Sequence, residues 1–223
     1  MHRPPQIPSL ASALALQTTE VRVGAHQFSL VHPASVDELL DREEFTRDDR
    51  LPYWAEIWPS APVLAQRILL DQGRGRRLLE LGSGVGLVAL AAAQAGFDVL
   101  ATDVEPTALD FLHVNALRNR LPDIETRIMD WRHLPADLGP FDVVAGSDVL
   151  YERPLAALIA HGLSKTIAPG GIGLIADPGR SVARPLVDEC HQRGLEANCV
   201  ATVPVENDGK PLTVELFEIR HRS

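Results

Sequence analysis

Three glycines and two acidic residues are spaced so that they could hold a small charged ligand. Gly82, Gly84 and Gly86 fall at every second position after a short apolar run that contains Glu80. Glycine permits positive φ angles and a close approach of the backbone to a ligand. The residues that follow are rich in Ala and Leu, so the pattern predicts a strand, a turn and a helix with unpaired N–H groups at its start. A second apolar run ends in Asp103.

The charge and spacing of these residues indicate which ligand they suit. Sites for dinucleotides carry G-x-G-x-x-G, whereas this chain has G-x-G-x-G preceded by Glu80. A carboxylate there would repel a pyrophosphate but suits S-adenosylmethionine, which carries an ammonium, a sulfonium and one carboxylate. Asp103 is placed to accept hydrogen bonds from ribose hydroxyls. The alternative is an ordinary strand-to-helix turn with incidental acids.

Residues 124–130 are predicted to form a third strand that ends in Asp130 and is followed by Trp131. Open α/β sheets hold their ligands at the carboxyl ends of the strands. We therefore predict that Asp130 accepts a hydrogen bond from the adenine amino group and that Trp131 flanks the ring. Simple packing is the alternative for Trp131.

Residues 141–152 begin as a fully apolar strand and turn polar at Ser147 and Asp148. Buried parallel strands have this composition. Asp148 and Tyr151 form an Asp-x-x-Tyr pair that would place a carboxylate and a phenol beside the methyl group. The alternatives are that Asp148 caps the following turn and that Tyr151 is a core aromatic with its hydroxyl at the surface.

An aromatic segment precedes the glycine-rich strand. Tyr53, Trp54 and Trp58 lie just before a predicted helix, for which Ser60 is the expected N-cap. Trp54 suits either the ligand pocket or the core, whereas Trp58 is predicted to be a core anchor.

The elements that must position these residues follow in a β-α-β order typical of an α/β sheet that is parallel except for one late strand. Residues 19–32 predict a hairpin, and Ser35 begins a possible short helix. We expect a flexible tail at 1–18, the hairpin and short helix at 19–50, and one domain at 51–223.

Composition limits the possible functions. The 223 residues are 45% hydrophobic and 23% charged, as in a globular protein. A net charge of −9 argues against a nucleic-acid partner. Two cysteines make no disulfide framework or zinc cluster, so no metal site is predicted. No apolar run is long enough for a membrane span, and the proline-rich start argues against a signal peptide, so we expect no membrane association and a cytoplasmic protein.

Together these motifs resemble a known family. PYWAEIWPSA, LELGSGVGL, ATDVEP, MDW and SDVLYE look like the seven-β-strand protein lysine methyltransferases, or methyltransferase family 16, from about residue 50 to 180. DPGR after the fifth strand is similar to the branch that methylates the β-subunit of electron transfer flavoprotein, although the N-terminal part assigns no branch. The resemblance implies a Rossmann-like, mostly parallel seven-stranded sheet of order 3-2-1-4-5-7-6, with the seventh strand antiparallel and helices on both faces.

The resemblance also implies roles for individual residues. The expected cofactor contacts are Trp54, Glu80, Gly82, Gly84, Asp103, Trp131 and Ser147, whereas Asp148 and Tyr151 would line the substrate entrance. The predicted activity is S-adenosylmethionine-dependent methylation of a lysine side chain in a protein substrate. Asp148 would attract and orient the lysine, and Tyr151 would shape the slot around it. The alternatives are a small-molecule N-methyltransferase and a non-catalytic module that keeps the cofactor fold.

Overall fold

The computed structural model describes residues 14–36, 39, 51–180, 183–207 and 209–222. The predicted hairpin is present as β1 (Leu16–Val23) and β2 (His26–Pro33), which pair in an antiparallel ladder. Because Leu16 pairs with Pro33, the tail predicted at 1–18 extends too far. Most of the short helix predicted after Ser35 lies outside the described residues.

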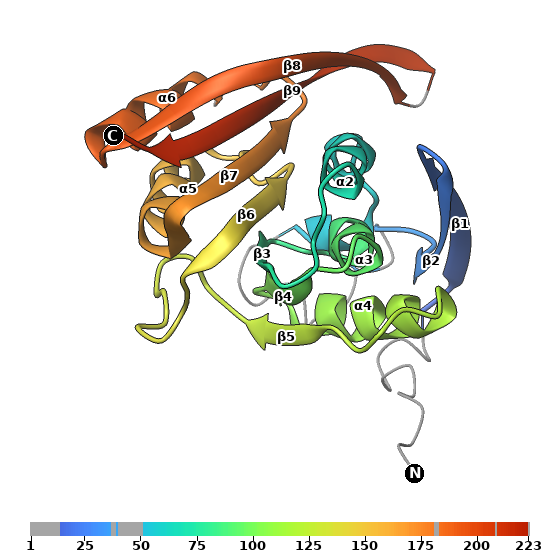
Figure 1. Cartoon of the computed structure of the whole chain (residues 1–223). Coiled ribbons are helices and arrows are strands. Elements are labelled where there is room, and N and C mark those ends of the chain that lie inside the picture. Colours follow the sequence, from blue (N-terminus) through green and yellow to red (C-terminus); the bar gives the residue numbers. More distant parts are fainter. Residues whose placement is uncertain (1–13, 37–38, 40–50, 181–182, 208, 223) are drawn as a thin grey trace.

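The centre of the molecule is a seven-stranded sheet (Figure 1). Its strands, in spatial order, are β5 (Glu125–Ile128), β4 (Asp98–Asp103), β3 (Arg77–Leu81), β6 (Phe141–Ser147), β7 (Ile167–Asp177), β9 (Lys210–His221) and β8 (Leu195–Asn207). Neighbours from β5 to β7 are parallel, and β9 is antiparallel to both β7 and β8. The expected order 3-2-1-4-5-7-6 is thereby confirmed.

Helices cover both faces of this sheet (Figure 1). One face carries α2 (Ser60–Leu69), α3 (Leu87–Gln94) and α4 (Pro106–Arg118), and the other carries α5 (Arg153–Thr166) and α6 (Ala183–Gln192). Successive side chains of a strand point to opposite faces, so Leu78 packs in the core under α2–α4 and Leu79 in the core under α5 and α6. Among the described residues, no helix has the length and apolar character needed to cross a bilayer.

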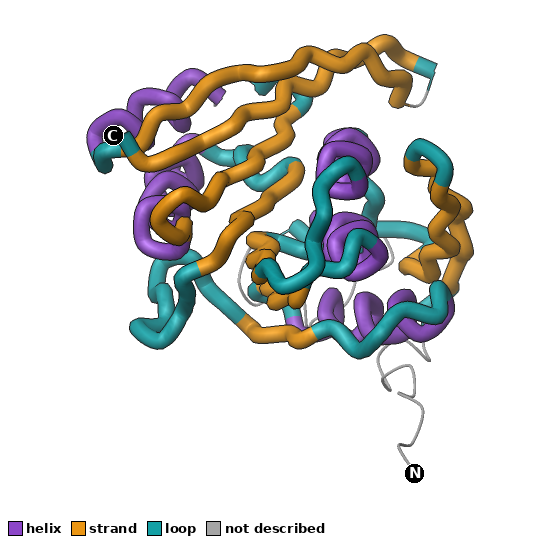
Figure 2. The backbone as a smooth tube through the Cα atoms, in the orientation of Figure 1, coloured by secondary structure: helices purple, strands orange, loops and turns teal. Residues whose placement is uncertain are grey.

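Two strand boundaries affect the site. β5 ends at Ile128, earlier than the predicted 124–130, so Asp130 lies in the loop beyond the strand. β9 pairs with β7 only over Glu215–Ile219, and the rest of β9 pairs with β8 alone. Figure 2 shows this two-stranded ribbon continuing past β7.

The buried side chain of Asn115 in α4 joins the hairpin to the glycine-rich turn. Its Oδ1 accepts from Val31 N at 2.8 Å, and its Nδ2 donates to Val31 O at 3.0 Å and Val85 O at 2.9 Å. Asn115→Ala would leave these buried groups unpaired, so we expect the free energy of unfolding to fall by about 3 kcal/mol in urea titrations. Asn119→Ala is the matched control, because its bonds to Ser29 are only partly buried and should cost less. Equal losses of unfolding free energy in the two variants would show that the buried bonds of Asn115 are not the source of the effect.

Candidate active site

The turn after β3 has positive φ angles at its three glycines. Gly82, Gly84 and Gly86 have φ angles of 69°, 51° and 101°. A Cβ on Gly82 would lie 3.1 Å from the Trp131 ring, and one on Gly84 would lie 3.1 Å from the carbonyl oxygen of Trp54. The turn therefore has little room for side chains, and its backbone forms one wall of the cavity below.

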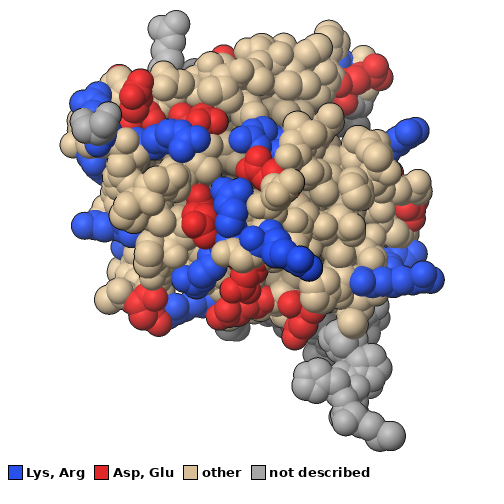
Figure 3. Space-filling model, in the orientation of Figure 1, with Lys and Arg blue, Asp and Glu red and all other residues tan. Residues whose placement is uncertain are grey.

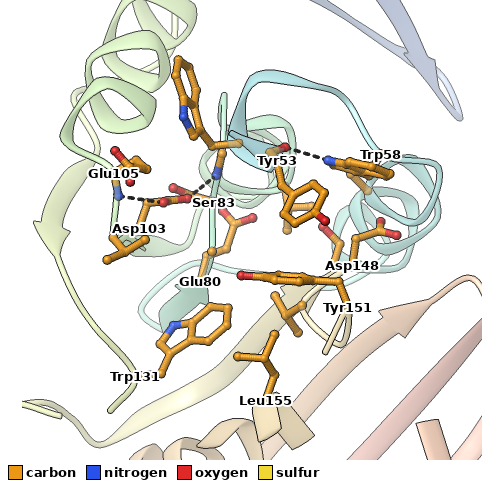
Figure 4. Close-up of a pocket in the computed structure, with 18 of the residues that line it drawn as sticks. Tyr53, Trp58, Glu80, Ser83, Asp103, Glu105, Trp131, Asp148, Tyr151 and Leu155 are labelled. Atoms are coloured by element: carbon orange, nitrogen blue, oxygen red, sulfur yellow. Dashed lines mark hydrogen bonds between the residues drawn. The ribbon is translucent and has the colours of Figure 1, made fainter. Parts of the chain in front are cut away.

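Two buried acids flank this turn (Figure 4). Asp103 accepts hydrogen bonds from Gly84 N at 2.9 Å and from Glu105 N at 3.0 Å, which fixes its carboxylate beside the turn. Burial raises its pKa above the ordinary aspartate value despite these bonds. Glu80 is 1% exposed, and burial together with the nearby Asp103 raises its pKa well above the ordinary glutamate value. Both acids would be stabilised as carboxylates by a cationic or hydrogen-donating ligand.

A cavity of about 650 Å³ lies at the carboxyl ends of β3, β4 and β6. It is lined by every predicted site residue, namely Trp54, Glu80, Gly82, Gly84, Asp103, Asp130, Trp131, Ser147, Asp148 and Tyr151. Figure 4 shows Glu80, Asp103 and Trp131 on one side and Tyr53, Trp58, Asp148 and Tyr151 on the other. The fold thus brings the predicted cofactor and acceptor residues into one space.

Polar atoms at the glycine turn suit a bound ligand. Glu80 Oε2, Ser83 Oγ and Trp131 Nε1 are buried and have no hydrogen-bond partner among the described residues. Buried polar groups are normally paired, so unpaired ones mark a place where a ligand can supply the partner. These donors and acceptors fit S-adenosylmethionine, whose amino, carboxylate and adenosine groups both donate and accept.

The loop after β5 modifies one prediction. Asp130 accepts hydrogen bonds from the backbone N–H of Arg132 at 2.9 Å and from the Arg132 guanidinium. Part of the capacity of the Asp130 carboxylate to accept hydrogen bonds is therefore already used. Its contact with an adenine amino group stays a prediction. Trp131 is half-buried, packs against the core under α5 and also lines the cavity. Its packing role is thus present, and its contact with the adenine ring stays a prediction.

The two other tryptophans differ in environment. Trp54, in the short 3₁₀ helix η3 (Tyr53–Ala55), is 6% exposed and packs on Phe111 with ring centroids 5.7 Å apart, while it also lines the cavity. The prediction that Trp58 is a core anchor is wrong. Trp58 is half-buried in the cavity wall, because the chain is extended at Glu56 after η3, and its Nε1 donates to Tyr53 O at 2.7 Å.

Aromatic rings form the wall beside Asp148. The rings of Tyr53 and Tyr151 lie 4.8 Å apart and those of Tyr53 and Trp58 5.7 Å apart. Tyr151 is 39% exposed, so it is not the core aromatic that the alternative interpretation required. Tyr53 was not among the predicted site residues, although its place beside Trp54 was a signal that could have identified it.

Asp148 sits at the carboxyl end of β6 and is 7% exposed. Its Oδ2 accepts from Ser60 N at 3.0 Å, and Arg180 Nη2 lies 3.3 Å from its Oδ1. Burial raises the pKa of Asp148 to about 6, against the opposing effects of Arg180 and the Ser60 bond. Asp148 therefore caps the start of α2 and not the following turn. Ser60, the predicted N-cap, is the first residue of that helix.

Gly86 is the tightest point of the turn. A Cβ there would lie 2.7 Å from Leu112 Cγ, at a φ of 101°. We expect Gly86→Ala to lower the free energy of unfolding by about 2–4 kcal/mol, because backbone strain and overlap add. Gly75→Ala is the control, since Gly75 also has positive φ but nothing within 4 Å of a Cβ. That change should cost about 1 kcal/mol. Similar losses in urea denaturation would show that the Leu112 contact is unimportant.

Comparison with known proteins places the chain in a family. Residues 47–181 match the sequence model of a family described as lysine methyltransferase. The chain belongs to this family. The match includes the glycine turn, both buried acids and the Asp-x-x-Tyr pair, so the resemblance seen in the sequence is confirmed. No group of His, Cys, Asp and Glu side chains placed to bind a metal ion occurs in the part of the chain that the structure describes.

The similar relatives are named protein methyltransferases. A Xenopus laevis protein named electron transfer flavoprotein beta subunit lysine methyltransferase is 35% identical over 135 residues, which cover 58% of this chain and 54% of that protein. A Mus musculus protein named histone-arginine methyltransferase METTL23 is 36% identical over 107 residues, which cover 45% and 42%. The chain spans about half the length of the relatives it matches.

A solved structure agrees on the fold. The 16S rRNA N2 G1207 methyltransferase RsmC of T. thermophilus, in complex with AdoMet and guanosine, superposes with a TM-score of 0.63 at 15% identity, covering 93% of this chain and 51% of that one. This likeness shows the class I methyltransferase fold. Membership of the lysine methyltransferase family assigns S-adenosylmethionine as the cofactor.

Proposed function

We propose that this protein transfers a methyl group from S-adenosylmethionine to a lysine side chain of a protein substrate. One observation carries the proposal. The acid-flanked glycine turn opens into the same cavity as a nearly buried carboxylate, Asp148, and the partly exposed Tyr151. A donor site and an acceptor site for a cationic side chain are therefore continuous, and membership of the lysine methyltransferase family supports this reading.

On this proposal each cofactor-binding residue contacts a different part of S-adenosylmethionine. Asp103 accepts from ribose hydroxyls, Glu80 faces the positive charge, and Trp131 and Trp54 flank the adenosine. When bound, the cofactor supplies an electrophilic methyl group on a sulfonium. The glycine turn brings backbone N–H groups close to the ligand, as glycine residues permit.

The residues at the acceptor end of the cavity deprotonate and orient the substrate lysine. A lysine ammonium, with an ordinary pKa of about 10.4, must lose a proton before its nitrogen can attack. Asp148 attracts and orients the ammonium and accepts the proton directly or through water. Tyr53 and Tyr151 hold the alkyl chain in a narrow slot and exclude water, so positioning supplies most of the rate enhancement.

The β-subunit of electron transfer flavoprotein is the proposed substrate. It is supported by the names of the similar relatives and by the DPGR sequence after β7. The test is incubation of the protein with methyl-labelled S-adenosylmethionine and either purified electron transfer flavoprotein or a cell extract, followed by mass spectrometry of the labelled proteins. An unlabelled β-subunit beside other labelled proteins of the extract would reject this substrate. Label on no protein would reject the function.

An arginine acceptor is a second candidate, because one relative is named a histone-arginine methyltransferase. Mass spectrometry of the labelled peptide distinguishes methyl-lysine from methyl-arginine. Label confined to small molecules would instead favour a small-molecule N-methyltransferase. Failure of S-adenosylmethionine to raise the melting temperature would favour the non-catalytic module.

We also propose that nucleic acid is not the acceptor and that the protein acts in the cytoplasm. Lys and Arg side chains are interleaved with Asp and Glu on the face shown in Figure 3, and the chain has a net charge of −9. Neither this mixed distribution of charge nor the net negative charge favours binding of the phosphate backbone of a nucleic acid. Tight binding of RNA at physiological salt would contradict the first proposal, and cell fractionation tests the second.

A further inference from the structure

Arg180 links two buried carboxylates at the acceptor end of the cavity. Its Nη2 lies 3.3 Å from Asp148 Oδ1, and its Nη1 lies 3.2 Å from Asp177 Oδ2. Its backbone N–H also donates to Asp177 Oδ1 at 2.8 Å. The side chain is 26% exposed, whereas those of Asp148 and Asp177 are 4% and 0% exposed. The guanidinium carbon lies over the Trp58 ring, 5.9 Å from its centre, and both residues line the cavity.

The charges in this cluster do not cancel. Asp148 and Asp177 share a single guanidinium, so the three side chains carry one net negative charge when both acids are ionised. Glu215 of β9, paired in register with Asp177, adds to the negative potential. Asp148 Oδ1 is buried, and Arg180 Nη2 at 3.3 Å is its ion-pair partner. Both Asp148 and Arg180 line the cavity. Because the cluster has one negative charge in excess, it can still attract a cation, and Asp148 is the acid of the pair that lines the cavity.

We propose that Arg180 is a positioning residue of the acceptor site, which keeps Asp148 ionised and fixed so that Asp148 can receive the acceptor amine. This inference rests on the proposed lysine-methylating function. Removing the guanidinium would leave two buried carboxylates near each other, and such a pair retains a proton to relieve the repulsion. A protonated Asp148 neither attracts an ammonium nor accepts its proton.

The electrostatics of the cluster support this role. Burial raises the pKa of Asp148 to about 6 and also raises the pKa of Asp177, and in both cases Arg180 acts in the opposite direction. On the α2 side, Ser60 donates to Asp148 through its backbone N–H, which also favours the ionised form. Arg180 is the cation that faces both acids in the described part of the cluster.

The test compares Arg180→Met, which keeps the length and loses the charge, with the conservative Arg180→Lys. The first measurement is the ¹³C carboxyl resonance of Asp148 as a function of pH, assigned with Asp148→Asn, and it needs no acceptor. We expect the titration midpoint to rise by about one pH unit or more in Arg180→Met and by less in Arg180→Lys. Arg132→Met is the matched control, because Arg132 pairs with Asp130 in the same cavity. It should leave the midpoint unchanged.

The second measurement is the pH profile of methyl transfer to purified electron transfer flavoprotein. The acidic limb of kcat should move upward with the Asp148 midpoint in Arg180→Met, while the Kd for S-adenosylmethionine changes less than about twofold. In an Asp148→Asn background, Arg180→Met should reduce kcat by no more than about twofold, because its effect acts through Asp148.

The outcomes separate the two proposals. An unchanged Asp148 midpoint in folded Arg180→Met, judged by its amide spectrum, overturns the role of Arg180. A large further loss of kcat in the double variant does the same. If the wild-type protein labels no protein at all while the midpoint still moves, the proposed function fails and the electrostatic link between Arg180 and Asp148 stands.

Discussion

Replacing Asp148 with Asn is expected to reduce methyl transfer about 100-fold at neutral pH and to leave S-adenosylmethionine binding nearly unchanged. Asn keeps an oxygen that can accept from Ser60 N, which Asp148 now does at 3.0 Å, so the start of α2 stays capped. What is lost is the negative charge that attracts and deprotonates the lysine. Steady-state kinetics on the labelled acceptor and calorimetric titration of the cofactor measure the two effects separately.

The same strand offers a matched control. Asp142 lies at the opposite end of β6, where it accepts from Arg77 N at 2.8 Å far from the cavity. Asp142→Asn should therefore retain nearly wild-type transfer. A wild-type rate in Asp148→Asn would remove Asp148 from the mechanism.

The pH dependence provides a further check on Asp148. Burial raises its pKa to about 6, so the carboxylate is present above that pH and is lost as the pH falls through it. We expect kcat/KM of the wild type to show an added fall below about pH 6 that is missing in Asp148→Asn.

Replacing Asp103 with Asn is expected to weaken S-adenosylmethionine binding about 100-fold, as measured by calorimetry. Both Asp103 oxygens accept backbone N–H groups, from Gly84 at 2.9 Å and Glu105 at 3.0 Å. An amide can accept with only one oxygen, so its NH₂ would meet one N–H group and disturb the glycine turn. The ribose hydroxyls would also lose a charged acceptor, and such bonds contribute about 1.5–3 kcal/mol each.

Asp98→Asn is the control for this variant, because Asp98 is the exposed first residue of the same strand, β4. It should bind the cofactor as the wild type does. Equal affinity in Asp103→Asn and wild type would show that the acid at the end of β4 does not hold the ribose.

The sequence predicted the features of the site that are set by residues close together in the chain, namely the glycine turn and the acids at the strand ends. The alternation of Gly82, Gly84 and Gly86 after an apolar strand required a tight turn, and all three have positive φ angles. Acids at the ends of consecutive strands had to meet at one edge of a parallel sheet, and Glu80 and Asp103 do so. The order of helices and strands likewise predicted the α/β sheet.

The errors arose where a side chain's partner lies far away in the sequence. Trp58 was predicted to be a core anchor for the helix that follows it, but the extended backbone at Glu56 places it in the cavity wall. Ser60 had the right type for an N-cap, yet the start of the helix is capped by Asp148, the residue after β6. Asn115 gave no local signal of its bonds to the hairpin, because nothing in its own helix requires them.

For this protein the sequence alone determined the glycine turn, the acids beside it and the family, since backbone conformation and strand ends depend on residues a few positions apart. Only the tertiary structure decided which charges meet. Arg180 follows β7 and Asp148 follows β6, and they pair because these two strands are neighbours in the sheet. Burial between packed layers then sets the pKa of Asp148, and that burial depends on the whole fold and not on any local motif.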